Sequence, residues 1–224
     1  ITPSEGARGV VARAFAARVL PLQVIPHALA VPLAERSPAR ADGVLRVALL
    51  GAPSAPWKGA DDVLAVMSAT RDLALEWHVF GDADAHGFPD GAAAALGTAA
   101  DARLHLHGRY VRDEIAARLA AADVDVTLAL SPWAETFSYT LSESWAAGVP
   151  AIVRDLGAPA DRVRSSGAGI VVADAQGATA ALRRLAGNAD ERQRLADAAR
   201  AAARGEPSLG ENAERHRSAC AALL

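Results

Sequence analysis

Short apolar segments alternate with amphipathic segments along most of this chain, and that alternation limits the folds open to it. Apolar runs of about four to eight residues bounded by glycine or proline are typical of buried strands, whereas the segments between them repeat alanine and leucine at helical spacing. Strands separated by crossover helices pair in parallel, and a parallel sheet is covered by helices on both sides. The sequence therefore predicts an α/β fold, a Rossmann-like parallel sheet with helices on both faces.

The strands that we expect cover Leu45 to Leu50, Ala74 to Phe80, Arg103 to His107, Val124 to Leu128, Ala151 to Val153 and Gly169 to Val172. The helices that we expect cover Ala60 to Thr70, Ala92 to Gly97, Arg112 to Ala121, Tyr139 to Ala147, Pro159 to Ser165, Gly177 to Ala186, Asp190 to Arg204 and Gly210 to Leu224.

The chain begins with a helix-opening sequence. Thr2 is the expected N-cap, Pro3 the first helical residue, and Glu5 stands three residues after the cap, as in a capping box. We expect this helix to run to about Arg18.

A different organisation precedes the alternating segments. Leu22 to Ile25 is expected to form a short strand, and the polar stretch 34–43 to be a linker. We therefore divide the chain into residues 1–43, the end of a preceding domain plus its linker, residues 44–204, a sheet-based domain, and residues 205–224, a C-terminal helical segment.

Composition excludes several classes of protein. The apolar fraction of 51% is ample for a core, yet no apolar run reaches the ~18 residues of a membrane span. A net charge of −3 argues against nucleic acid as a partner.

Cys220 is the only cysteine, which fits a reducing, cytoplasmic compartment. The chain starts at Ile1 and its only methionine is Met67, so we expect translation to begin upstream.

Ligands of parallel sheets bind where strands end and helices begin. Gly51, Gly81 and Gly108 each follow an expected strand, and Lys58 precedes the helix that follows the first of them. The dinucleotide and P-loop signatures are both absent. Lys58 is either a solvated charge or, beside a helix N-terminus, the partner of a bound polyanion.

Glu135 and Glu143 flank a further helix start. In a continuous helix their eight-residue separation corresponds to roughly 12 Å and a rotation of about 80°. Two carboxylates that act as an acid and nucleophile pair lie roughly 5 to 10 Å apart. We therefore expect the two glutamates to hold different ends of one long ligand; pairing with the helix dipole is the alternative.

Metal ligands are also suggested, though weakly, by short patterns. Asp82-Ala83-Asp84 and Asp123-Val124-Asp125 are D-x-D triplets, but two carboxylates alone make a poor divalent site. His105 and His107 share one face of a strand, with no third ligand within sequence reach. We predict no metal site and no cofactor.

The segment Ser131 to Val153, which contains both glutamates, resembles the E-x7-E core of the retaining family-four (group 1) glycosyltransferases. Further matching positions occur in the family's order at Lys58-Gly59, Gly81, Gly108 and Gly167-Ala168-Gly169. The resemblance covers Val44 to about Arg204 and implies the donor-binding C-terminal half of a GT-B enzyme. Ile1 to Ile25 resembles the end of the N-terminal half, so most of the acceptor-binding half is expected to be absent.

The resemblance implies a role for each matching residue. Glu143 would bind the ribose hydroxyls and Glu135 the donor sugar, while Lys58 would neutralise the leaving diphosphate. Lys58 and Glu135 are thus the expected catalytic residues. The other expected donor-binding residues are Gly51, Gly81, Arg109, Tyr110, Phe137, Ser138, Tyr139 and Thr140.

These residues would act in three groups. The backbone N–H groups at Ser138, Tyr139 and Thr140 would bind the diphosphate. The loop with Arg109 and Tyr110 would contact the base. Phe137 would line the donor pocket with Trp133 and Trp145, although aromatic residues beside a helix start often belong to the core instead.

By resemblance, the function is transfer of a sugar with retention from a nucleoside diphosphate sugar, such as a UDP- or GDP-sugar, to a glycan or lipid-linked acceptor. The full-length protein would be cytoplasmic, with peripheral association at the inner face of the membrane as an option, and this chain alone would be weakly active or inactive. Two positions depart from the family: Ala52-Pro53 follows Gly51 where many members have arginine, and Ser138, whose side chain can still cap the helix, replaces a common glycine. A GT-B nucleotide-sugar epimerase and a non-catalytic nucleotide-sugar-binding module therefore remain alternatives.

Overall fold

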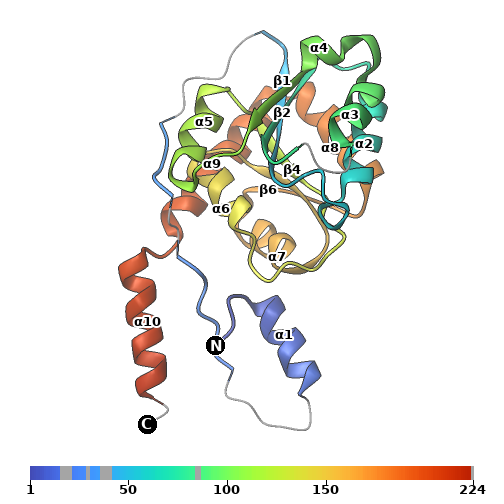
Figure 1. The fold of residues 1–224 in the computed structure, drawn as a ribbon. Helices are drawn as coiled ribbons and strands as arrows, with labels where there is room; N and C mark the ends of the chain where they lie inside the picture. The colour runs from blue at the N-terminus through green and yellow to red at the C-terminus, as the bar shows by residue number, and fades with distance from the viewer. Residues whose placement is uncertain (16–21, 29–30, 36–41, 84–86, 223–224) are drawn as a thin grey trace.

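The computed structural model describes residues 1–15, 22–28, 31–35, 42–83 and 87–222, and it contains a six-stranded parallel sheet with the strand order β3-β2-β1-β4-β5-β6 (Figure 1). The strands are β1 Leu45–Gly51, β2 Leu75–Gly81, β3 Leu104–Gly108, β4 Val126–Ala129, β5 Ala151–Arg154 and β6 Gly169–Val172. Because the order reverses between β1 and β4, the loops after these two strands diverge and leave room for a ligand at that edge.

Helices cover both faces of this sheet (Figure 1). One face carries α2 Ala60–Ala69, α3 Phe88–Leu96 and α8 Ala175–Ala186, and the other carries α5 Ile115–Ala121, α6 Tyr139–Ala146 and α9 Ala189–Gly205. The remaining elements are α1 Glu5–Ala14, η1 Pro56–Lys58, η3 Gly97–Ala99, α4 Ala100–Arg103, η4 Arg112–Glu114, α7 Gly157–Ser166 and α10 Leu209–Ala221. The predicted fold class is confirmed.

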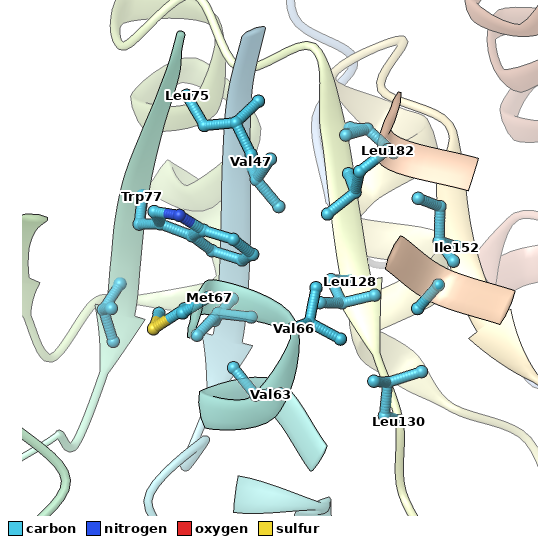
Figure 2. Close-up of a cluster of buried hydrophobic side chains, with 14 of the residues drawn as sticks. Val47, Val63, Val66, Met67, Leu75, Trp77, Leu128, Leu130, Ile152 and Leu182 are labelled. Carbon is cyan, nitrogen blue, oxygen red and sulfur yellow. The ribbon is translucent and has the colours of Figure 1, made fainter. Parts of the chain in front are cut away.

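The main core fills the space between β1, β2, β4 and the helices α2 and α8 (Figure 2). Trp77 on β2, Met67 on α2 and Leu182 on α8 are all fully buried. Leu75, Trp77 and Val79 of β2 point into this core, and Phe80 reaches the second core beneath α5. The apolar residues of β2 are thus buried on both sides of the sheet.

Two expected helices differ from the observed ones. The segment from Arg112 to Ala121 begins with the 3₁₀ turn η4 before α5 starts at Ile115. The helix expected from Ala92 begins earlier, at Phe88. Pro89 stands in its first turn, where proline is tolerated because the first N–H groups have no helical partner.

The predicted N-cap at Thr2 is wrong. Ser4 caps α1 instead, and its side chain accepts a hydrogen bond from the Ala7 N–H at 3.0 Å. The Thr2 backbone is engaged elsewhere: its N–H donates to the Gln23 carbonyl, and its carbonyl accepts from the Ile25 N–H, each at 2.9 Å. A residue paired in this strand-like way cannot also start the helix.

The other predictions for the N-terminal segment are confirmed only in part. The expected strand from Leu22 to Ile25 is reduced to a single bridge between Thr2 and Val24. The helix ends at Ala14, and the expected end at Arg18 lies outside the described residues, as does 36–41 of the predicted linker. Among the described residues, no helix combines the length and apolar character that a membrane crossing requires.

Candidate functional site

A cleft that is partly open to solvent lies at the carboxyl ends of β1 and β4, where the strand order reverses. Its walls come from these strands, from the loops that follow them and from the start of α6. The lining residues that carry polar side chains are Lys58, Thr127, Ser131, Glu135, Ser138 and Thr140. Among the described lining residues, Lys58 is the only cation and Glu135 the only carboxylate.

Lys58 and Glu135 form an ion pair in this cleft, with Lys58 Nζ 2.6 Å from Glu135 Oε1. Their side chains retain 34% and 20% of their exposure, so both remain accessible to a ligand. The close packing of Gly59 helps to fix Lys58: a Cβ on Gly59 would lie 2.2 Å from the Leu130 carbonyl oxygen. The loop after β1 therefore lies directly against the loop after β4.

Helix α6 begins at the cleft with an unusual N-cap. Ser138 has φ +71°, a conformation that costs a non-glycine residue about 1–2 kcal/mol. Ser138 is the N-cap residue by position, but its hydroxyl lies 3.2 Å from the Thr140 hydroxyl and makes no capping hydrogen bond. The first-turn N–H groups of α6 thus have no side-chain cap among the described residues, which suits an anion.

Arg162, which the sequence did not single out, holds the loop before α6. Its guanidinium donates to the carbonyls of Phe137 and Ser138, each at 2.9 Å, and also pairs with Glu206. The same group stacks on the rings of Phe137 and Trp145 at 4.1 and 4.9 Å. Burial lowers the pKa of Arg162 and raises that of Glu206, although their mutual attraction opposes both shifts.

Glu143 lies one turn into α6 and is 4% exposed. The Tyr110 hydroxyl donates to its Oε2 at 2.8 Å, and Arg112 Nε is 3.4 Å from Oε1. Burial, followed by the charge of Glu143, raises the pKa of Tyr110, so the hydroxyl stays protonated as a donor. Arg112 in turn lies over the Tyr139 ring at 4.7 Å. Glu135 and Glu143 thus have separate partners.

The family described as Glycosyl transferases group 1 matches residues 44–188, which hold the whole sheet and the cleft. The chain belongs to this family.

Several solved structures share its fold. A sucrose-phosphate synthase from Thermosynechococcus elongatus has a TM-score of 0.75 at 18% identity, covering 99% of this chain and 57% of its own. The pneumococcal O-GlcNAc transferase GtfA in complex with UDP and GlcNAc has a TM-score of 0.71 at 19% identity, covering 97% and 44%. HepE from Anabaena in complex with UDP has a TM-score of 0.63 at 15% identity, covering 80% and 48%. None of the curated proteins matches this chain.

The chain thus spans about half the length of these structures. Because their identities are only 15–19%, these structures show the fold alone and do not indicate a particular donor or acceptor.

Other members of the predicted site lie at varying distances from the cleft of this group 1 domain. Gly51 and Gly81 pair across β1 and β2, and the Asp82 N–H donates to the Gly51 carbonyl at 3.0 Å. Arg109 is exposed and pairs with Asp82 at 2.7 Å. The ring of Phe137 is buried against Arg162, outside the lining of the cleft, in agreement with the core alternative.

Groups that could hold a metal lie outside the cleft. Asp84 of the first D-x-D triplet is not among the described residues, and in the second triplet Asp125 accepts a hydrogen bond from the Arg46 N–H at 2.9 Å. In the part of the chain that the structure describes, one group has ligand atoms close enough for a metal ion: Glu76, His78 and His105.

Proposed function

We propose that this domain binds the nucleoside diphosphate sugar of a retaining glycosyltransferase and contributes the groups that stabilise its leaving diphosphate. One observation carries the proposal: the cleft joins Lys58 and Glu135 to the N-terminus of α6, with buried Glu143 one turn further along that helix. A cation and a helix start at one point suit a diphosphate. Flanking carboxylates suit the hydroxyls of a sugar and of a ribose.

One carboxylate oxygen of Glu143 remains available to accept a hydrogen bond from a ribose. Its Oε2 is engaged by Tyr110, but the 3.4 Å contact of Oε1 with Arg112 is longer than a strong charge-assisted hydrogen bond of ~2.7–2.9 Å. A ribose hydroxyl could therefore donate to Oε1 while Tyr110 keeps the carboxylate in place.

The chemical role of Lys58 follows from the same arrangement. As the bond between the sugar and the diphosphate breaks, negative charge grows on the departing oxygen, and a preorganised cation lowers the energy of that state. Glu135, on the other side of the ion pair, would accept hydrogen bonds from the sugar. No metal or cofactor is needed in this scheme, and the acceptor, a glycan or lipid-linked precursor, would be held by a further domain of a cytoplasmic or membrane-associated protein.

UDP is the first nucleotide to test, because two of the structurally similar proteins hold it. Isothermal titration should detect binding of UDP or GDP and of their sugars. Replacing Glu143 by alanine should weaken nucleotide binding about 10- to 100-fold, since a hydrogen bond to a charged group contributes ~1.5–3 kcal/mol. Glu114→Ala, an exposed glutamate on η4, should leave the affinity unchanged.

Two outcomes would overturn the assignment: no binding at millimolar nucleotide, or binding that Glu143→Ala does not alter although the variant is folded by circular dichroism. A non-catalytic binding module is a second candidate, favoured by Lys58 being the only cation in the described lining. Product analysis of the full-length protein by mass spectrometry and NMR separates these activities: a transferase gives a glycosylated acceptor, an epimerase an isomerised sugar, and a module neither.

A further inference from the structure

We propose that Glu76, His78 and His105 bind a zinc-type divalent ion at a site separate from the donor cleft. Glu76 and His78 belong to β2 and His105 to the edge strand β3. His78 and His105 are register partners in these parallel strands, so their side chains leave the same face of the sheet. The two further ligands that His105 lacks on its own strand thus come from the neighbouring strand β2.

The ligand atoms lie close together, but farther apart than the ligands of a bound ion. One atom of each residue lies within 4.8 Å of the others. Ligands of tetrahedral zinc, at ~2.0–2.2 Å from the metal, lie roughly 3.4 Å from one another. His105 is the ligand that would move to shorten these distances. It is only partly buried, and its strand β3 lies at the edge of the sheet with one neighbouring strand.

Unpartnered nitrogen atoms indicate that this cluster lacks a ligand. The side chain of His78 is 8% exposed, and the Nε2 atoms of His78 and His105 are buried without a hydrogen-bond partner among the described residues. Glu76 Oε2 lies 3.6 Å from His78 Nε2, too far for a hydrogen bond. A buried polar atom without a partner is unfavourable, and a shared cation would satisfy all three groups.

Neighbouring residues hold the ligands as an outer shell does in metal sites. His78 Nδ1 lies 3.0 Å from His107 Nε2, which directs the other nitrogen of His78 toward Glu76 and His105. Arg46 Nε lies 3.0 Å from Glu76 Oε2 and so fixes the carboxylate. The positive charge of Arg46 is balanced by Asp42, 2.7 Å away.

The chemistry of the ligands favours zinc over magnesium or calcium. Two imidazoles and one carboxylate, completed by water, form a set that Zn²⁺ accepts, whereas the harder ions prefer oxygen ligands. Imidazole binds a metal ion in its neutral form. A bound ion would link the edge strand β3 to β2.

The test is a zinc titration of the chelator-treated protein against a chromophoric competitor. We expect one ion per chain, and at least about 100-fold weaker binding in His78→Ala and in His105→Ala, since outer-shell changes alone cost 10–100-fold. His216→Ala, which removes a histidine whose Nδ1 contacts the Asn212 carbonyl within α10, should bind zinc as the parent does. Co²⁺ should give the visible spectrum of a four-coordinate site in the parent and in His216→Ala, but not in His78→Ala or His105→Ala.

A second measurement guards against misfolded variants. Zinc should raise the Tm of the parent and of His216→Ala but not that of His105→Ala, whose edge position lets the variant fold. The proposal fails if no ion binds at about 100 µM zinc. A Kd above that concentration corresponds to a binding free energy weaker than ~5.5 kcal/mol. The proposal also fails if His105→Ala, folded by circular dichroism, binds zinc as tightly as the parent. Neither result bears on nucleotide binding, so the donor proposal stands or falls separately.

Discussion

Replacing Gly81 by alanine is expected to destabilise the domain by more than about 4 kcal/mol, because the change forces a backbone clash. Gly81 ends β2 with φ +135°, and a Cβ there would lie 1.6 Å from the Gly51 carbonyl oxygen. That carbonyl also accepts the Asp82 N–H, so it cannot move without breaking the end of the sheet. Chemical denaturation in urea measures the loss.

Gly167→Ala is the matched control. Gly167 also has a positive φ, +67°, but no atom lies within 4 Å of the position of its Cβ. Only the conformational penalty applies there, about 1–2 kcal/mol. Equal losses of stability in the two variants would mean that the contact between the loops after β1 and β2 is not as close as described.

Arg162→Ala is expected to cost about 3–5 kcal/mol, since it leaves Glu206 buried without its cation. The variant also frees the carbonyls of Phe137 and Ser138, which Arg162 holds in front of α6. We therefore expect it to weaken nucleotide binding as well. Urea denaturation and nucleotide titration measure the two effects.

Arg164→Ala provides the comparison on the same helix. Its partner Asp155 and Arg164 itself are about half exposed, and exposed ion pairs contribute ~0–1 kcal/mol. Should Arg162→Ala fail to fold, Glu206→Gln keeps the shape of the pair while removing its charge. Unchanged nucleotide affinity in a folded Arg162 variant would show that Arg162 does not position the start of α6.

The regular elements of the sheet could be predicted because their signals are local. β1 and β2 are mainly apolar and end in glycine, and each observed strand lies within about two residues of the predicted one, as is usual for element ends. Helix α6 was also predicted correctly, because its start lies between Glu135 and Glu143 in the segment that resembles the family. The separate partners of the two glutamates agree with separate roles, which remain a prediction.

The features that were missed depend on residues far apart in sequence. Thr2 is a good N-cap by type, but its pairing with Gln23 and Ile25 decides its conformation. Arg162 acts on carbonyls 24 and 25 residues before it, and no spacing pattern encodes that contact. His78 meets His105 only because β2 and β3 pair in that register.

If the domain binds a donor as proposed, the ion pair of Lys58 and Glu135 also bears on release of the spent nucleotide. A complete donor would offer a diphosphate to Lys58 and sugar hydroxyls to Glu135, so each side chain exchanges one partner for another. After transfer, the nucleotide alone would engage Lys58 and leave Glu135, only 20% exposed, without its cation. Restoring the ion pair would then favour departure of the spent nucleotide and leave the cleft ready for another donor.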